Sequence, residues 1–341
     1  MTLLDHSQWA ALFPSRPAGT PEEVSLRLGE LRFTQGADPR LHFHMLAPAG
    51  WRWRPNEEAG NPEGLLASLV IDVAATAEIA VFVDHVPREV NPADWTLHRL
   101  EREGFSLWAR RQAPTPIGTM ADLLTRREAP GGAVIARTNM AKDGKRIFTI
   151  TCRAREDEYP RWAGDFSAVL ATFRLSSPER APLAEELASY GYLYPAAVGF
   201  SYPASWAVAH ESLGQTTCDV RLDAVAGDPS AGSLLFSART GARPRKLVAD
   251  CFSALEAGGA HFEARADLEP CPPPEGFAEA WTVTAPGARD GRDIEARALV
   301  LVSPQATLLL GSCGPTRAAS AFDWMVVERA FEMARHTVYA V

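Results

Sequence analysis

The sequence lacks the long apolar run of a membrane-spanning protein, and its first residues do not have the pattern of a secretory leader. Its longest uncharged apolar stretch, "ALVLVSPQATLLLG" at 298–311, is interrupted by polar residues and a proline before the roughly 20 residues that a bilayer span requires. The segment "MTLLDHSQWAALFPSRP" at 1–17 has neither the cationic start nor the continuous apolar region of a secretory signal. We therefore expect no transmembrane segment and a cytoplasmic location.

Cysteine is scarce. The chain has five cysteines, an odd number, and none of them forms a Cys-x-x-Cys pair. This excludes a disulfide framework and a zinc site of the usual spacing, and it favours inert thiols in a reducing compartment. A nucleophilic thiol would need a nearby base and a low pKa, so we interpret the strand-end cysteines as structural. The five are Cys152, Cys218, Cys251, Cys271 and Cys313.

The sequence also lacks concentrated positive charge and the common catalytic motifs. Its net charge of −8 argues against nucleic acid as the main partner, because phosphate binding needs a concentrated positive face. It has no glycine-rich phosphate loop, and no Gly-x-Ser-x-Gly motif presents Ser201 to His210 and Asp219 as a triad would require. We predict that the protein is not an enzyme and has no cofactor.

One metal site has to be weighed. His42 and His44 lie two residues apart, so in a strand both imidazoles point to the same side and could clamp a transition metal. A third ligand, such as His85 or His98, would have to come from elsewhere in the chain. Isolated strand histidines at an exposed edge are far commoner than such sites. We therefore predict no metal and keep His42 and His44 only as the candidates to examine.

What the sequence does contain indicates a folded chain of two domains. Apolar residues make up 46% of the 341 residues, with nine tryptophans and fifteen phenylalanines. The length suits two domains of roughly 100–200 residues each. Two short stretches, "LAPAGW" at 46–51 and "SYPASW" at 201–206, share a Pro-Ala-small-Trp core. Neither holds a group that could move a proton, so we interpret them as one structural corner present twice.

The order of predicted elements repeats after each corner. In the first half, strands at 65–86 precede a helix at 91–104, a hairpin turning at 142–145 and an amphipathic helix that ends at 175. In the second half, strands from 217 precede a helix at 245–259, further strands and a closing helix at 321–338. Cys152 and Cys313 each end the last strand before the closing helix. We predict an internally duplicated α+β fold with two antiparallel sheets, each with helices packed on one face or at one end.

The repeat sets the predicted domain boundaries. The stretch "SSPERAPLAEELASYGYLYP" has the proline-rich start of a connection and suggests a short helix at 182–189. Trp9, Leu12 and Phe13 suggest a short docking helix near the N-terminus, with a mobile tail as the alternative. The predicted divisions are an N-terminal extension at 1–35 that belongs to neither copy, a first domain at 36–175, a linker at 176–195 and a second domain at 196–341.

The corners and the elements after them resemble the PsbP-like superfamily. The resemblance rests on Phe43, Pro48 and Trp51, on the helix with "ADWTLHRLEREG", on the Lys-Asp-Gly-Lys hairpin, and on the closing "FSAVLATFRL". It covers most of 41–175 and, more loosely, 198–337. This superfamily includes a photosystem II subunit, a Ran-binding nuclear-transport factor and the Eag chaperones of type VI secretion. The resemblance implies a twisted sheet whose surface binds proteins and rarely catalyses reactions.

Aromatic residues beside arginines supply candidate partner-binding positions, because interfaces are enriched in tryptophan, tyrosine and arginine. Trp51 and Trp53 alternate with arginines, and the simpler interpretation is that Trp51 packs in the core while Trp53 covers its rim. The tyrosines and the "EYPRW" segment could instead join the two domains. The candidates are Trp53, Tyr159, Arg161, Trp162, Tyr192 and Tyr194.

These observations predict a non-enzymatic, cytoplasmic adaptor or chaperone that binds another protein. The resemblance implies a secreted effector or a component of a bacterial type VI secretion system as the partner. An alternative is a protein that binds a small ligand or lipid in a cleft between the two halves. A hydrolase or metal enzyme is the third hypothesis.

Overall fold

The chain divides into two compact units. A computed structural model describes residues 10–17, 19–72, 74, 76–115, 118–179, 181–262 and 267–340. The first unit comprises Met1–Pro87 and Asn91–Ala184, and the second comprises Arg88–Val90 and Glu185–Val341. The division after Ala184 falls inside the segment predicted as a linker. Trp9 lies outside the described residues.

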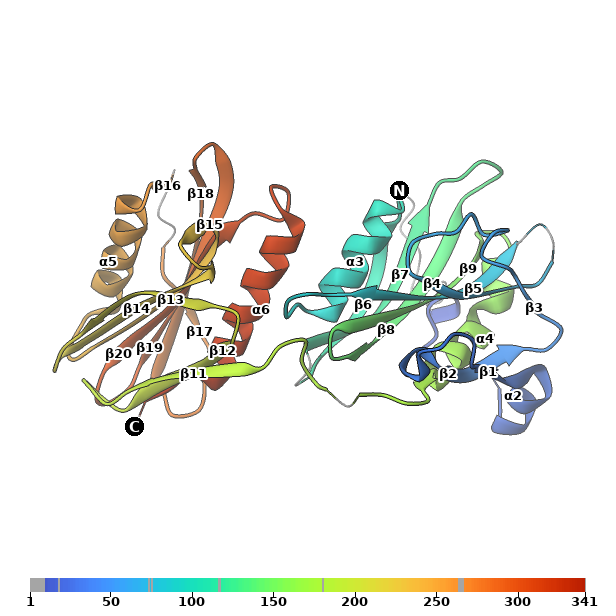
Figure 1. Cartoon of the computed structure of the whole chain (residues 1–341), viewed down its shortest axis with the longest axis horizontal. Coiled ribbons are helices and arrows are strands. Elements are labelled where there is room, and N and C mark those ends of the chain that lie inside the picture. Colours follow the sequence, from blue (N-terminus) through green and yellow to red (C-terminus); the bar gives the residue numbers. More distant parts are fainter. Residues whose placement is uncertain are drawn as a thin grey trace. The chain divides into compact units, whose positions relative to one another are not determined.

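The first unit contains a small and a large antiparallel sheet (Figure 1). Its elements are α2 (Pro21–Arg27), β1 (Leu28–Phe33), η1 (Pro39–Leu41), β2 (Phe43–Pro48), β3 (Arg52–Trp53), β4 (Leu65–Val70), β5 (Ala77–His85), α3 (Pro92–Arg102), β6 (Ser106–Thr115), β7 (Gly118–Arg127), β8 (Val134–Asp143), β9 (Arg146–Arg155), α4 (Tyr159–Thr172) and β10 (Arg174–Leu175).

The second unit repeats this order. Its elements are β11 (Leu187–Tyr192), β12 (Val198–Pro203), β13 (Ala207–Leu213), β14 (Thr217–Val225), β15 (Asp228–Arg239), α5 (Pro244–Ala257), β16 (Ala260–Phe262), β17 (Glu269–Cys271), β18 (Glu279–Arg289), β19 (Arg292–Val302), β20 (Thr307–Pro315), α6 (Ala321–Thr337) and β21 (Tyr339–Ala340).

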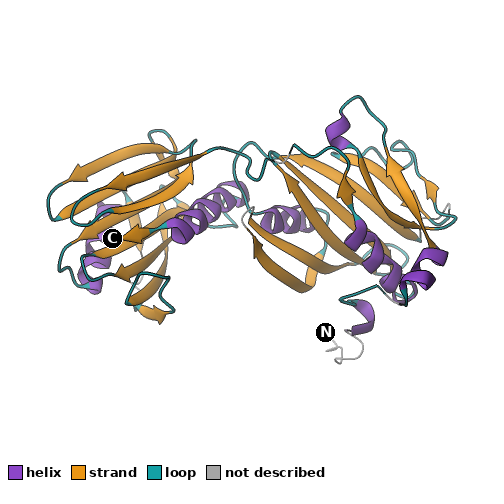
Figure 2. Ribbon diagram, turned by 90° about the horizontal axis from the view of Figure 1, so that it is seen from below, coloured by secondary structure: helices purple, strands orange, loops and turns teal. Residues whose placement is uncertain are grey.

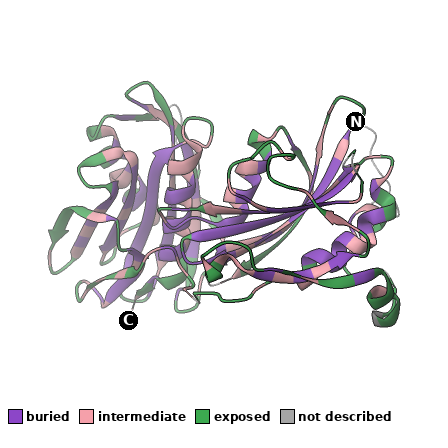
Figure 3. Ribbon diagram, turned by 45° about the vertical axis from the view of Figure 1, so that its right-hand side comes forward, coloured by how far each residue is buried: buried purple, intermediate pink, exposed green. Residues whose placement is uncertain are grey.

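The sheet orders confirm the duplicated α+β fold. The large sheets run β3-β4-β5-β9-β8-β7-β6 and β13-β14-β15-β20-β19-β18-β16, with β17 also paired to β18. The small sheets run β1-β2-β10 and β11-β12-β21. Strands β9 and β20 lie centrally and are buried over most of their length, as the buried colour of the central strands shows (Figure 3). Among the described residues, no helix has the length and apolar character needed to cross a bilayer.

The two longer helices of each unit lie on opposite faces of its large sheet, rather than on one face or at one end as predicted (Figure 2). Phe148 and Ile150 of β9 share a core with Phe166 of α4. Their strand neighbour Thr149 points the other way, and its hydroxyl lies 3.4 Å from that of Thr96 on α3. This arrangement buries both faces of the central strands.

The repeated corner has the same backbone geometry in both units. In the first, β2 ends at Pro48 and the Trp51 amide donates to the Pro48 carbonyl at 3.3 Å. In the second, β12 ends at Pro203 and the Trp206 amide donates to the Pro203 carbonyl at 3.0 Å. Proline fixes φ where the strand must turn, so both corners serve the fold.

Two local predictions were wrong. Residues 28–33 of the predicted extension form β1, which pairs with β2 from Leu28↔Pro48 to Phe33↔Phe43, so the extension contributes a strand to the first unit. The predicted helix at 182–189 is absent, and Leu187–Tyr192 forms β11 paired with β12. In both segments, pairing with a neighbouring strand provides partners for the backbone hydrogen-bonding groups.

The two strand-end cysteines are buried, but they do not occupy matching faces. Cys152 shares a core with Tyr159 and Trp162 of α4. Cys313 instead shares a core with Leu247 of α5. The β8–β9 turn uses residues 144–145 and the β19–β20 turn uses 303–306, and a one-residue offset moves a strand side chain to the other face. Burial raises the pKa of both thiols, as expected of structural cysteines.

Candidate protein-binding sites

The first corner forms one wall of a groove of about 600 Å³ in the first unit. The other wall is the first turn of α4. We call this the first-corner groove. Its lining residues are Arg27, Pro48, Ala49, Gly50, Trp51, Ile71, Pro160, Arg161, Trp162, Gly164 and Asp165.

Two indoles and a guanidinium give the first-corner groove its chemistry. The Trp51 ring meets the Trp162 ring edge-on at 5.2 Å between centroids, with an interplanar angle of 80°. The guanidinium of Arg161 lies over the Trp162 ring at 4.9 Å. At the rim, Arg27 pairs with Asp165 at 3.1 Å. Indole rings bordered by guanidinium groups suit an apolar side chain that has acidic neighbours.

The local sequence keeps both walls of the groove in place. Pro48 ends β2, and the Ala49 amide donates to the Arg27 carbonyl at 2.9 Å. Pro160 lies in the first turn of α4, where its missing N–H removes no helical bond. Trp51 also meets Phe166 of α4 edge-on at 6.2 Å. The groove is therefore preformed, and partner binding does not require a long loop to become ordered.

The second corner presents its tryptophan differently. Trp206 is 3% exposed, whereas Trp51 is only half-buried and faces the groove. The two corners thus have the same backbone geometry but differ in how far their tryptophan side chain is exposed to a partner.

Arg161 and Trp162 both line the first-corner groove, whereas Tyr159 does not. Tyr159 is fully buried, and its ring lies 5.7 Å from that of Phe166. The structure therefore corrects its assignment as a partner-binding residue, because it sits on the inner side of α4. Burial also raises its pKa. Trp53 is 39% exposed on β3, with its ring 6.0 Å from Phe33, as expected of a residue covering the rim of the core.

Tyr192 and Tyr194 lie in the second unit, at the turn between β11 and β12. Their rings are 6.2 Å apart and edge-on. Tyr194 is 54% exposed and Leu193, between them, is 73% exposed. Sequence reasoning missed Leu193, although an apolar residue between two tyrosines in a turn is a readable signal. This exposed turn is a second candidate surface.

The two histidines lie at the start of β2. His42 precedes β2, and its Nε2 lies 3.4 Å from the Gly36 carbonyl oxygen. His44 lies on β2, opposite Arg32 on β1 and Arg174 on β10. Within the described ranges, no group of three or more histidine, cysteine or acidic residues could hold a metal ion.

Fold and surface together define a tandem α+β protein with an aromatic groove in one copy. No protein-family model matches the chain. No curated protein matches it either. Among solved structures, the chain is similar to the cyanobacterial PsbP of Synechocystis sp. PCC 6803, with 12% identity, a TM-score of 0.34, and coverage of 46% of this chain and 98% of that one.

Two further solved structures are similar to the chain. LpqN of Mycobacterium tuberculosis, involved in cell envelope biogenesis, is 16% identical with a TM-score of 0.29, over 45% of this chain and 91% of its own. The type VI secretion immunity protein TplEi of Pseudomonas aeruginosa is 12% identical with a TM-score of 0.22, over 83% and 97%. The superfamily named from the sequence resemblance includes the first of these three proteins. TM-scores this low say nothing about what the chain binds.

Proposed function

We propose that the protein is a non-enzymatic binding protein whose first unit holds a segment of another protein in the first-corner groove. The observation that carries the proposal is the edge-on pair of Trp51 and Trp162, with Arg161 over the Trp162 ring, along a concave surface. Aromatic and arginine side chains in a preformed concavity are typical of interface hot spots.

The groove also suggests what the partner segment contains. Arg161 is paired only loosely, at 3.9 Å from Glu158, and both side chains are well exposed. Such a pair contributes little, so Arg161 remains able to bind a carboxylate of the partner. The expected segment has an aromatic or large aliphatic anchor next to an acidic residue.

Binding such a segment would make the protein an adaptor or chaperone for the partner that contains it. The sequence resemblance to a superfamily that includes type VI secretion chaperones supports a secreted effector or a secretion component as the partner, in the cytoplasm.

The duplicated corner supplies a matched test. Ala49 is exposed and lines the first-corner groove, and Ala204 is exposed at the same place in the second corner. Each amide donates to the preceding segment at 2.9 Å, so the two sites tolerate substitution alike. Tagged Ala49→Trp, Ala204→Trp and unchanged protein would be used to recover partners from lysate of the native host, with quantification by mass spectrometry.

We expect Ala49→Trp to lose at least tenfold of the specific partner, because the new indole fills the groove, while Ala204→Trp retains it. Arg161→Ala should weaken recovery of the same partner about fivefold. Equal recovery by all the variants, or the absence of any specific partner, would contradict the proposal.

A further inference from the structure

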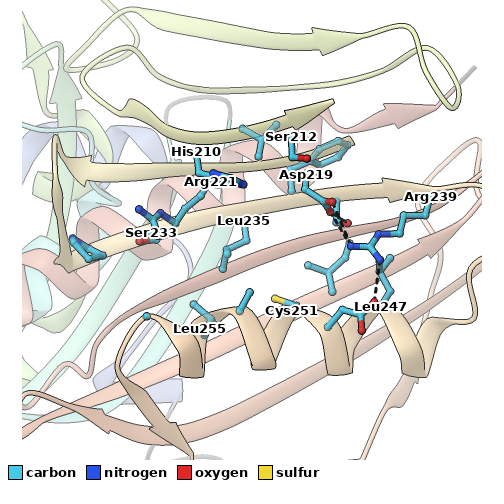
Figure 4. A pocket seen from close by; sticks show the side chains of 18 of the residues that line it. His210, Ser212, Asp219, Arg221, Ser233, Leu235, Arg239, Leu247, Cys251 and Leu255 are labelled. Atoms are coloured by element: carbon cyan, nitrogen blue, oxygen red, sulfur yellow. Dashed lines mark hydrogen bonds and ion pairs between the residues drawn. The ribbon is translucent and has the colours of Figure 1, made fainter. Parts of the chain in front are cut away.

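The second unit contains a pocket between helix α5 and the face of the large sheet that α5 covers. The pocket has a volume of about 360 Å³, within the usual range of small-molecule sites. In Figure 4, α5 forms one wall, and side chains of the strands point toward it from the other. We call it the helix–sheet pocket. It lies wholly within the second unit.

The middle of the helix–sheet pocket is apolar. Leu235 on β15 lies opposite Leu247 and Leu255 on α5 (Figure 4). Leu309 on β20 completes this region. A hydrocarbon chain or ring placed here would leave water for an apolar surface, which is favourable in proportion to the area buried.

One end of the pocket holds a compensated ion network. Arg239 donates to Asp250 at 2.9 Å and to Asp219 at 3.3 Å, and Lys246 lies 3.4 Å from Asp250. Ser237 also donates to Asp219. Two cations therefore balance two carboxylates, and this end offers little attraction to a further charge.

The other end has an excess of positive charge. His210 and Arg221 are directly opposite each other on β13 and β14, and Arg221 pairs with Asp223 at 3.2 Å. Arg289 also lines the pocket and is 5% exposed. Its guanidinium donates to the Pro229 carbonyl at 2.7 Å and lies 3.8 Å from the Cys313 sulfur.

Arg289 is the decisive residue. Its Nε is buried and has no hydrogen-bond partner. Among the described residues, no carboxylate forms an ion pair with it. A buried cation without a counter-charge is costly, so proteins normally pair such groups. An anion entering the pocket would provide the missing partner.

In the first unit, a long connection packs on the sheet face that corresponds to the pocket-bearing face of the second unit. The connection from β3 to β4 spans residues 54–64, and Ala59 from it packs on Leu65, Ala80 and Phe82. In the second unit, residues 214–216 make the same connection. The pocket therefore lies where the second copy lacks the cover that the first one has.

We propose that the helix–sheet pocket binds a small amphipathic anion, with its carboxylate or phosphate group against Arg289 and its apolar body against Leu235, Leu247 and Leu255. This site is separate from the first-corner groove and does not depend on the groove's function.

The test uses the full chain and isothermal titration calorimetry with four probes of one chain length: octanoate, octyl phosphate, octylamine and 1-octanol. Arg289→Met removes the buried charge. Ala254→Trp blocks the pocket from an exposed position on α5 that lines it, and Ser253→Trp places the same ring on an exposed α5 residue that does not. Circular dichroism checks that each variant is folded.

We expect one octanoate or octyl phosphate per chain, with at least tenfold weaker binding of octylamine and octanol. Arg289→Met and Ala254→Trp should each weaken anion binding at least tenfold, because a charge-assisted hydrogen bond or the space itself is lost, and Ser253→Trp should not. Binding of only one of the two anions would identify the head group. The proposal is overturned if no probe binds, if octylamine binds equally well, or if Ala254→Trp has no effect.

Discussion

At the scale of single residues, the first unit depends on a buried carboxylate. Glu78 is 4% exposed and accepts two hydrogen bonds from Arg153, at 2.8 and 2.6 Å. It also accepts from Ser68 at 2.6 Å and lies 3.4 Å from Arg54. Charge-assisted bonds of this kind are strong only while both partners remain, because losing one leaves a desolvated charge.

We expect Glu78→Gln to destabilise the first unit by about 3 kcal/mol, since Arg153 and Arg54 would lose their buried counter-charge. The control is Glu30→Gln. Glu30 pairs with Arg32 at 2.9 Å, but both side chains are more than half exposed, so the loss of stability should be much smaller than for Glu78→Gln. Urea unfolding followed by tryptophan fluorescence measures both changes. Equal midpoints for the two variants would contradict this account of Glu78.

At the scale of elements, helix α6 approaches the central strand closely enough to require glycine. A Cβ on Gly314 of β20 would lie 2.9 Å from a methyl carbon of Val327 on α6. Real Cβ atoms seldom come so near another carbon, so either the helix or the strand would have to shift. The contact explains why β20 has a glycine at position 314.

Gly314→Ala should therefore destabilise the second unit by about 1–3 kcal/mol through overpacking. Adding Val327→Ala should recover part of that loss, so that the double variant is more stable than the two separate losses predict. Gly29→Ala on β1 serves as a control, because nothing lies within 4 Å of the added carbon. Thermal unfolding of the unchanged protein, the two single variants, the double variant and the control gives the comparison. Strict additivity would mean that Val327 is not what limits the site.

Elements with a strong local signal could be predicted from the sequence. The helix expected at 91–104 spans Pro92–Arg102, and the predicted Lys-Asp-Gly-Lys hairpin turns at Gly144 with φ of 59°. The segment at 182–189 could not be assigned in this way. Its helix-forming residues are outweighed by pairing with β12, a tertiary contact that no local pattern records.

The two candidate sites also differ in how far they could be predicted from the sequence. Arg161 and Trp162 became candidates because aromatic and arginine residues stand together in one segment, and the structure places both at the first-corner groove. The helix–sheet pocket was missed because its lining comes from several strands and one helix. Asp219 and Arg221 alternate with Val220 and Leu222, a pattern typical of a strand whose polar face meets solvent. That α5 covers this face becomes evident only in three dimensions.

At the scale of the whole molecule, the duplicated fold provides two copies of one framework. Each copy carries a different candidate binding site. The first has the groove at its corner, and the second has the pocket under α5. A ligand specific to one of them should stabilise that unit and leave the other unchanged, because stabilisation by binding acts only on the unit whose folded form binds.

Hydrogen exchange of the full chain with octanoate tests this division. At one hundred times its dissociation constant, octanoate should stabilise the second unit by about 2.7 kcal/mol. Amides of β14, β15 and α5 that exchange through unfolding of that unit should then slow about a hundredfold, because they face or flank the helix–sheet pocket. Amides of β5 and β9 should keep their rates, and Arg289→Met should abolish the slowing. Protection spread evenly over both units would instead mean that octanoate binds without regard to the pocket.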